Sequence, residues 1–280
     1  MKDRSKLRRF VHRIANKRLY QWGADLLNAV ALIRVGGLGA CLSLKQKAAP
    51  PGAKFCQVSL KNIPHPIHFR PGTADANTIV QSLVRREYGM FKHPIDAVNI
   101  IDAGSFIGDA SIFFHGTFPK ARIVALEPNA ANHTLAALNL KPYADRVTLL
   151  NAGLWNEPAT LSVTGESTGS RLVAAPESGA EVIRCTDINT IMSENGFTHL
   201  DILKLDIEGA EREVFGSNYE RWLPVTKLVI IEFHGDDIER TILDLLGSMH
   251  FECYRYRSLF YCYNSQFAPL GRPAETARAS

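Results

Sequence analysis

The stretch that decides the fold is Val98–Asp109, with the sequence VNIIDAGSFIGD. Its apolar run 98–101 is typical of a buried strand, and the run stops at the acidic residue Asp102. A glycine-rich turn at 104–108 follows, and residues 110–118 have the pattern of a helix. Glycine lets a backbone turn sharply and approach a ligand closely, and free N–H groups at a helix start favour an anionic group. This order of elements is typical of an α/β domain that presents a nucleotide-like ligand above its sheet.

The spacing of the glycine turn indicates which kind of ligand it takes. Dinucleotide-binding turns follow the pattern G-x-G-x-x-G, whereas here Phe106 stands at the second glycine and Asp109 at the third. A carboxylate at Asp102 repels phosphate but suits an ammonium group, such as the amino end of S-adenosylmethionine. The next predicted strand, residues 122–126, ends at Glu127, an acid that can accept both hydroxyls of a ribose. The loop and Glu127 together favour S-adenosylmethionine over an ordinary glycine turn with capping acids.

The charge of the chain is concentrated at its N-terminus. The net charge is only +4, but the first twenty residues hold eight basic side chains and one acid. The remaining residues are close to balanced, which argues against a nucleic-acid surface. The pattern favours a solvated terminus, and it leaves weak contact with a membrane surface or an acidic partner as an alternative.

Neither a membrane span nor a disulfide framework is expected. Residues 26–44 are apolar but contain Arg34 and three glycines, and no signal-peptide pattern is evident. The five cysteines are odd in number and show no CxxC spacing, which predicts reduced thiols in a cytoplasmic protein. Cys253 and Cys262 are expected to face each other across a late hairpin, with core packing as their default role.

The order of predicted elements divides the chain into four parts. They are a basic arm (1–52), a lead-in subdomain (53–95), a core domain (96–267) and a tail (268–280). The lead-in is expected to hold short strands at 55–60 and 67–69, a capping acid at Asp75 and a helix over 76–88. Within the core, strands are predicted at 98–101, 122–126, 146–151, 202–205 and 228–231, and helices at 110–118, 129–140, from 207, and 236–246. Strands that alternate with helices imply a parallel sheet. Two features break this order: extra strands at 160–163 and 181–184, and a closing antiparallel hairpin at 251–256 and 259–263.

This order of elements and several motifs resemble the FkbM family of S-adenosylmethionine-dependent methyltransferases. The motifs are RPGTAD with the helix that follows it, IDAGSFIGD, ALEPN, DILKLDIEGAE (201–211) and IIEFH (230–234). The resemblance covers roughly residues 65–265, and LKLDIEGAE is its most specific part. It implies an α/β, Rossmann-like sheet of seven strands, mostly parallel with a terminal antiparallel hairpin, and an N-terminal helical and strand extension. Ser105 and Phe106 depart from the small pair often seen in the family's loop.

The resemblance also implies the cofactor-binding residues. Asp102, Gly104 and Gly108 match the loop that meets the methionine portion of S-adenosylmethionine, and Ser105 belongs to the same loop. Glu127 matches the acid that holds the ribose. Asn151 lies where the adenine edge is usually read. Asp102, Glu127 and Asn151 end or follow predicted strands. Ligands of parallel sheets bind beyond the carboxyl ends of the strands.

The implied activity is O-methylation of a hydroxyl on a sugar, glycan or small metabolite. A hydroxyl has a high pKa, so the site needs a general base or a metal ion. The candidates are His234 as base, with Asp206 and Glu208 beside it, and Asp206 with Glu232 as oxygen ligands for Mg²⁺. Alternatively, Glu208 and Glu211, which is a further candidate acid, only stabilise a helix start, and Lys204 pairs with one of the acids.

Two other classes of function are open at this point. One is an oxidoreductase on the same architecture, which the residue at position 106 disfavours. The other is a non-catalytic methyltransferase-like module that binds a partner or a glycan, which the acids at 102, 127 and 206 disfavour.

Overall fold

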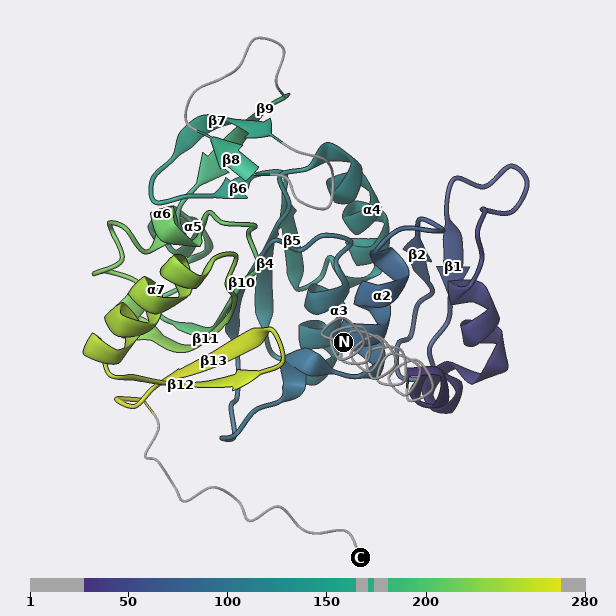
Figure 1. Cartoon of the computed structure of the whole chain (residues 1–280), viewed down its shortest axis with the longest axis horizontal. Coiled ribbons are helices and arrows are strands. Elements are labelled where there is room, and N and C mark those ends of the chain that lie inside the picture. The colour runs from purple at the N-terminus through teal and green to yellow at the C-terminus, as the bar shows by residue number, and fades with distance from the viewer. Residues whose placement is uncertain (1–27, 165–170, 174–180, 268–280) are drawn as a thin grey trace, which may run out of the picture. The chain divides into compact units, whose positions relative to one another are not determined.

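The computed structural model describes residues 28–164, 171–173 and 181–267. The chain splits into two compact units, Met1–Arg85 and Arg86–Ser280, which are described separately below (Figure 1). The basic arm up to residue 27, the predicted loop at 165–170 and the tail at 268–280 lie outside the described residues. Among the described residues, no helix has the combined length and hydropathy that a membrane span requires.

The first unit contains the lead-in strands as predicted. Strands β1 (Cys56–Val58) and β2 (Ile67–Phe69) pair antiparallel, after a helical segment over residues 28–44. The helix predicted over 76–88 is shorter than expected: α2 (Asp75–Ile79) continues as the π-helix η1 (Val80–Val84) and stops there.

The acid at the start of α2 has a different partner from the one expected. Asp75 is fully buried and makes no side-chain cap. Instead its carboxylate accepts hydrogen bonds from the backbone N–H of Arg70, at 2.7 Å, and from the Arg70 guanidinium, at 2.8 Å. A buried carboxylate needs such compensation, so this pair ties the turn after β2 to the helix.

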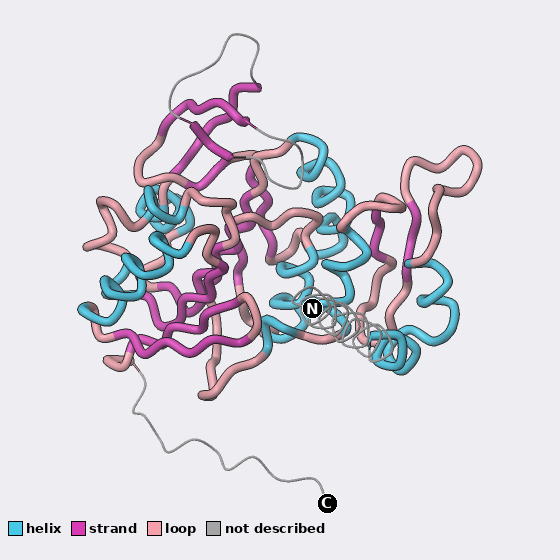
Figure 2. The backbone as a smooth tube through the Cα atoms, viewed as in Figure 1, coloured by secondary structure: helices cyan, strands magenta, loops and turns pink. Residues whose placement is uncertain are grey.

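The second unit is built on the predicted seven-stranded sheet, and the fold class is confirmed. Its strands lie in the order β12-β13-β11-β10-β3-β4-β5 (Figures 1 and 2). The five parallel strands are β3 (Asn99–Ala103), β4 (Arg122–Leu126), β5 (Val147–Leu150), β10 (Leu200–Leu205) and β11 (Thr226–Glu232). The closing pair β12 (Phe251–Tyr256) and β13 (Leu259–Asn264) is antiparallel, and β13 lies antiparallel to β11.

The two central strands, β3 and β10, are buried along their whole length. This explains why their sequences are runs of apolar residues without alternation. Residues such as Ile101 and Leu203 pack on one face with helices α5 (Ile188–Asn195) and α7 (Asp236–Ser248). On this sheet, therefore, Asp102 and Lys204, which alternate with those residues, point to the opposite face.

Helices α3 (Asp109–Thr117) and α4 (Ala130–Leu140) connect β3, β4 and β5. The predicted cap of α4 is confirmed, because the Asn129 side chain accepts hydrogen bonds from the N–H groups of Ala131 and Asn132. The remaining turns are η2 (Glu87–Gly89), η3 (Lys141–Tyr143) and η4 (Leu223–Val225), all 3₁₀ helices.

The extra strands predicted after the third core strand form a small sheet of their own. Its order is β6-β9-β7-β8, from β6 (Gly153–Leu154), β7 (Ala159–Thr164), β8 (Arg171–Val173) and β9 (Glu181–Thr186). Both predicted strands, β7 and β9, are present and pair antiparallel. Figure 2 shows this sheet beyond the end of the main one.

The expectation of reduced thiols is wrong for one pair of cysteines. Cys253 and Cys262 face each other across β12 and β13, as predicted, but they are joined by a disulfide. Their Cα atoms are 4.0 Å apart, and the two residues lie directly opposite each other in the antiparallel pair. Cys41, Cys56 and Cys185 are free and buried.

Candidate active site

The order of the parallel strands reverses between β3 and β10, because the chain builds outward from β3 in both directions. Ligands of open α/β sheets bind beyond the carboxyl ends of the strands at such a reversal. Apart from Asp102, which lies within β3, the residues predicted to bind the cofactor and the acceptor end or follow β3, β4, β5, β10 and β11 at this edge. The sheet therefore brings segments more than 100 residues apart in sequence to one place.

The glycine loop after β3 is shaped by its contact with the end of β10. Gly104 has a φ of 78°, and a Cβ built on it would lie 1.8 Å from the carbonyl oxygen of Asp206. Gly108, with a φ of 87°, precedes α3, and Phe106 between them also has a positive φ of 50°. The hydroxyl of Ser105 is buried in this loop without a hydrogen-bond partner. The backbone conformation of the loop is thus fixed by the protein itself.

Asp102 lies inside β3 and not after its end, and its carboxylate is fully buried. One oxygen accepts a 2.6 Å hydrogen bond from the hydroxyl of Ser111, and the other lies 3.2 Å from the Nζ atom of Lys204. Lys204 therefore pairs with an acid, but not with one of those after β10 and β11 as expected: its partner is Asp102, the residue predicted to meet an ammonium group of the cofactor. The negative charge of Asp102 is thus compensated by the Ser111 hydroxyl and the Lys204 ammonium group.

Lys204 connects this buried pair to the glycine loop. Its Nζ atom donates hydrogen bonds to the carbonyl oxygens of Ala103, at 3.2 Å, and Gly104, at 2.6 Å. Burial acts to lower the pKa of Lys204, but the nearby carboxylates, Asp102 first among them, raise it above its ordinary value. The side chain therefore remains a cation and holds the start of the loop. Sequence reasoning gave Lys204 no such role, since only the parallel register places it beside Asp102.

Glu127 follows β4, and its side chain is buried. Its two oxygens accept hydrogen bonds from the backbone N–H groups of Phe106 and Asn129, both at 2.9 Å. Burial raises the pKa of Glu127 to about 7, against the lowering effect of these bonds, of the Asn132 amide and of the charge of Lys204. The Oε1 atom also accepts from the Asn132 amide, at 3.4 Å, so the lone pair that remains for a ligand is on the Oε2 atom.

Asn151 follows β5 and contacts the same segment. Its side-chain amide donates hydrogen bonds to the carbonyl oxygens of Glu127, at 3.0 Å, and Pro128, at 3.3 Å. The residue is exposed. Asn151 lies next to Glu127, as the two predicted roles in binding one nucleoside require. These hydrogen bonds use its amide nitrogen and not its amide oxygen.

His234, after β11, lies within a cluster of carboxylates. Its Nδ1 atom is 2.9 Å from Glu211, while its Nε2 atom is 3.7 Å from Asp206 and 3.6 Å from Glu208. The hydrogen bond to Glu211, opposed by burial and supported by the charges of Glu211, Asp206 and Glu208, raises the pKa of His234 to about 9. All three residues predicted for catalysis are thus brought together, and Glu211, the further candidate acid of the same stretch, lies with them.

The turn that carries Glu208 differs from its prediction. The helix expected from residue 207 begins only at Glu211, where the short helix α6 (Glu211–Val214) starts. Glu208 and Gly209 have φ values of 54° and 101°, which a right-handed helix cannot contain. Glu211 does not simply stabilise a helix start either, because its buried carboxylate is bonded to His234.

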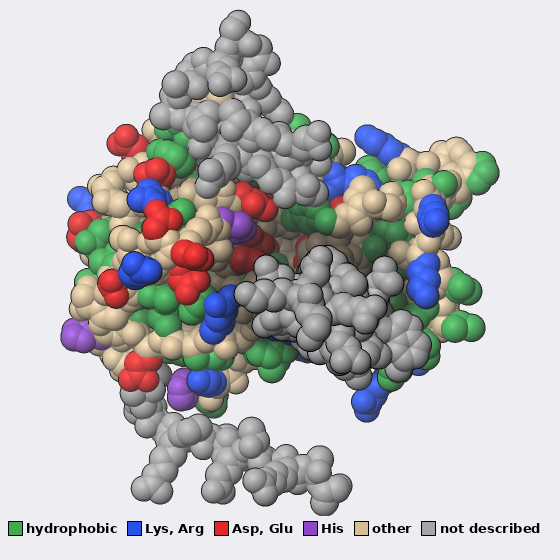
Figure 3. Space-filling view, in the orientation of Figure 1, with side chains coloured by type: hydrophobic (Ala, Val, Ile, Leu, Met, Phe, Trp, Pro, Cys, Tyr) green, Lys and Arg blue, Asp and Glu red, His purple; other side chains and the backbone are tan. Residues whose placement is uncertain are grey.

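Glu232 ends β11, next to the end of β10 as predicted. The three donor atoms that lie within 4.8 Å of one another are those of Asp206, Glu208 and His234, and this group does not include Glu232. Burial and the charge of Asp206 raise the pKa of Glu232. Burial likewise raises the pKa of Glu208, against the lowering effect of His234, and the charges of Asp206, Glu211 and Glu232 raise it further. The cluster is thus rich in mutually repelling carboxylates, and Figure 3 shows acidic side chains gathered beside a histidine on one face of the molecule.

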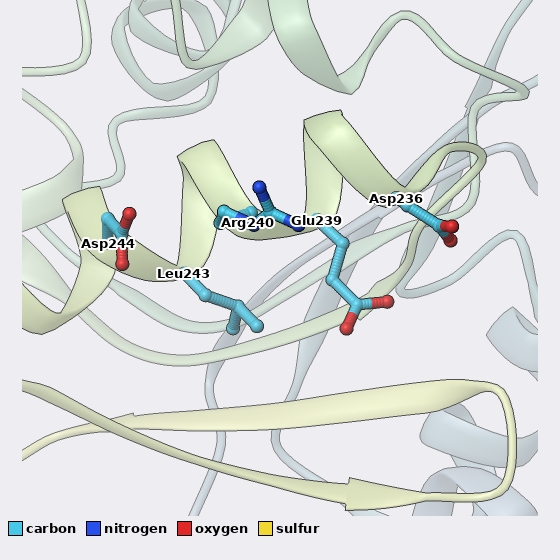
Figure 4. Close-up of a pocket in the computed structure, with 5 residues that line it drawn as sticks. All are labelled: Asp236, Glu239, Arg240, Leu243 and Asp244. Atoms are coloured by element: carbon cyan, nitrogen blue, oxygen red, sulfur yellow. The ribbon is translucent and has the colours of Figure 1, made fainter.

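A separate concavity lies along α7. Its lining residues are Asp236, Glu239, Arg240, Leu243 and Asp244, and all five belong to that helix (Figure 4). No loop at the carboxyl ends of the strands contributes to it, so its residues are not part of the candidate active site.

The comparisons with known proteins agree with this arrangement. The model of the methyltransferase FkbM domain matches residues 102–256, which is more than half of the chain. The chain therefore belongs to the FkbM family of methyltransferases.

Two curated relatives are similar over part of the chain. Methyltransferase sdnD of Sordaria araneosa is 27% identical over 195 residues, which cover 57% of this chain and 75% of that protein. AMB antimetabolite synthetase AmbE of Pseudomonas aeruginosa is 26% identical over 181 residues, which cover 50% of this chain and only 8% of that much longer protein. Among solved structures, methyltransferase FkbM from Methylobacillus flagellatus is 15% identical with a TM-score of 0.45. That match covers 67% of this chain and 53% of the other, so the chain spans about half of its length.

Proposed function

We propose that this methyltransferase uses S-adenosylmethionine to methylate a hydroxyl group on a sugar, a glycan or a small metabolite. The observation that carries the proposal is the position of Glu127: a buried carboxylate at the end of β4, adjacent to the glycine loop and to Asn151. Membership of the FkbM family supports methyl transfer.

The residues present fit this cofactor. Glu127 would accept the ribose hydroxyls, Asn151 would meet the adenine edge, and the loop with Gly104, Ser105 and Gly108 would lie along the methionine portion. The buried hydroxyl of Ser105, which has no partner of its own, supports this placement. When bound, S-adenosylmethionine supplies a methyl group that is already activated by its sulfonium. Asp102 would act by holding Lys204, and thereby the loop, and not by direct contact.

A hydroxyl acceptor is favoured by the ionisable residues after β10 and β11. An alcohol must lose its proton as the methyl group arrives, whereas a neutral amine attacks through its free lone pair. Asp206, Glu208 and His234 surround one position at which an acceptor could be oriented and its proton withdrawn. Correct orientation of the two reactants supplies a large part of such a rate enhancement.

The proposal is tested by calorimetric titration of S-adenosylhomocysteine into the full chain and into Glu127→Gln. We expect micromolar binding to the wild type and binding about 10- to 100-fold weaker in the variant, because a hydrogen bond to a charged group contributes about 1.5–3 kcal/mol. Glu157→Gln changes an exposed glutamate and serves as the matched control, with unchanged affinity expected. A folded wild type that does not bind this ligand would refute the proposed cofactor.

Cofactor affinity is also expected to depend on pH through Glu127. The bound hydroxyls need an ionised carboxylate, and the pKa of Glu127 is raised to about 7 in the free protein. Protonation therefore competes with binding below that pH, and affinity should fall about tenfold between pH 8 and pH 6. Calorimetry at both values checks this. Glu127→Gln controls for titration of the ligand itself, and an equal pH dependence in the variant would contradict the assignment to Glu127.

A further inference from the structure

Asp206, Glu208 and His234 have the composition and spacing of a metal-binding site. Their donor atoms, two carboxylate oxygens and one imidazole nitrogen, all lie within 4.8 Å of one another. Each side chain is partly exposed, so an ion can reach the group from solvent. The three residues come from the segments that follow two neighbouring parallel strands, β10 and β11, which fixes their backbones relative to one another.

The imidazole of His234 is oriented as a metal ligand is. Glu211 is fully buried and holds the Nδ1 atom at 2.9 Å, which leaves the Nε2 atom facing Asp206 and Glu208. Histidine ligands in metal sites commonly donate their other ring N–H to a carboxylate in this way, which fixes the tautomer and the direction of the ring. The cluster is therefore more than a group of acids, since its one nitrogen donor is held toward the two carboxylate donors.

The charges of the cluster are also those of a cation site. Four carboxylates, from Asp206, Glu208, Glu211 and Glu232, act on one another here, and a single imidazole lies among them. Lys204, the nearest buried cation, is already engaged by Asp102 and the loop carbonyls. One imidazolium compensates only part of this negative charge. A divalent cation between the carboxylates would compensate more of it.

We propose that Asp206, Glu208 and His234 bind a divalent transition-metal ion, with Mn²⁺ as the probe. A set of two carboxylates and one imidazole suits Mn²⁺ or Fe²⁺ better than Mg²⁺, which prefers oxygen donors only. This differs from the site predicted from sequence, in which Asp206 and Glu232 held Mg²⁺. The role of the ion rests on the proposed function: it would polarise the acceptor hydroxyl and orient it. Binding of the ion does not depend on that role.

The test is a titration of Mn²⁺ into the full chain, free of any purification tag and without methyl donor, followed by electron paramagnetic resonance. We expect one site in the wild type and binding at least tenfold weaker in Asp206→Asn and His234→Gln. Glu211→Gln should also weaken binding, by about 10- to 100-fold, because partners that orient a ligand typically contribute this much. Circular dichroism of each variant establishes that it is folded.

Glu220→Gln is the matched control, because it removes an exposed carboxylate from the segment after β10 that is neither one of the three donors nor one of the four carboxylates of the cluster. Its Mn²⁺ affinity should stay within about threefold of the wild type. If Glu232→Gln abolishes binding while His234→Gln retains it, the proposed ligand set is overturned. A folded wild type that binds no Mn²⁺ overturns the site altogether.

The same samples separate this proposal from the proposed function. Titration of S-adenosylhomocysteine without metal reports on the cofactor site alone. If this ligand binds and Mn²⁺ does not, the metal site is refuted and the methyltransferase proposal stands. If Mn²⁺ binds to the predicted residues and S-adenosylhomocysteine does not bind, the metal site stands and the proposed cofactor is refuted.

Discussion

Replacing Gly104 by alanine is expected to lower the free energy of unfolding by about 2–5 kcal/mol and to abolish cofactor binding. A left-handed backbone costs a non-glycine residue about 1–2 kcal/mol, and forcing an extra carbon into packed structure adds about 1–3 kcal/mol. Here the added carbon would lie 1.8 Å from the carbonyl oxygen of Asp206. The atoms that obstruct it belong to the backbone of Asp206, which follows β10, so the end of β3 and this segment would have to separate. Urea unfolding measures the first effect and calorimetry the second.

Gly116→Ala is the matched control for this substitution. Gly116 lies in α3, is exposed, and has no atom within 4 Å of a built Cβ. Alanine there should be neutral or should stabilise the protein by about 0.5–1 kcal/mol, as expected within a helix. If Gly104→Ala unfolds at the same urea concentration as the wild type, the loop is not packed against the end of β10 as described.

The second large effect is expected at Lys204. Lys204→Met would leave the fully buried carboxylate of Asp102 with Ser111 as its remaining partner, and would release the carbonyl oxygens of Ala103 and Gly104. Breaking a buried ion pair by removing one member costs about 3–5 kcal/mol. We therefore expect the free energy of unfolding, measured with urea, to fall by this amount. Cofactor affinity should fall as well, because the glycine loop loses the hydrogen bond from Lys204 that holds it to β10.

A second substitution separates the ion pair from general loss of packing. The double variant Asp102→Asn with Lys204→Met removes both charges, and it should be more stable than Lys204→Met alone. Lys227→Met, on the neighbouring strand β11, removes a lysine that is paired with Asp201 but is itself about one third exposed. The fall in the free energy of unfolding should be smaller than for Lys204→Met, because Asp201 keeps the backbone N–H groups of Val98 and Asn99 as donors. Additive losses in the double variant would show that Asp102 and Lys204 are not coupled.

Elements with a strong local pattern could be predicted from the sequence. The bounds of β4 are those predicted, Asn129 caps α4, and the closing hairpin and the two extra strands lie where expected. In each case the signal is local: an apolar run between polar turns, a cap residue before a helix, or strands separated by a short turn. The seven-stranded sheet follows because such elements alternate along the chain.

Contacts that depend on strand register could not be predicted in the same way. Nothing local indicates that Lys204 lies beside Asp102, since the parallel pairing of β3 with β10 joins residues about 100 positions apart. The predicted metal pair used the strand ends Asp206 and Glu232, but the positive φ of Glu208 turns that side chain toward His234 as well. The hairpin pattern did predict that Cys253 and Cys262 face each other, but the odd number of cysteines and their spacing gave no sign that they are bonded.

The left-handed conformation of Glu208 has a consequence for how this turn can change. A glycine at the same position would adopt it at no steric cost, so the chain carries roughly 1 kcal/mol of backbone strain there for the sake of a carboxylate. Stability and the chemistry of the site are thus opposed at one residue. Selection for stability alone would favour Glu208→Gly. The gain in stability would remove the carboxylate that lies beside His234.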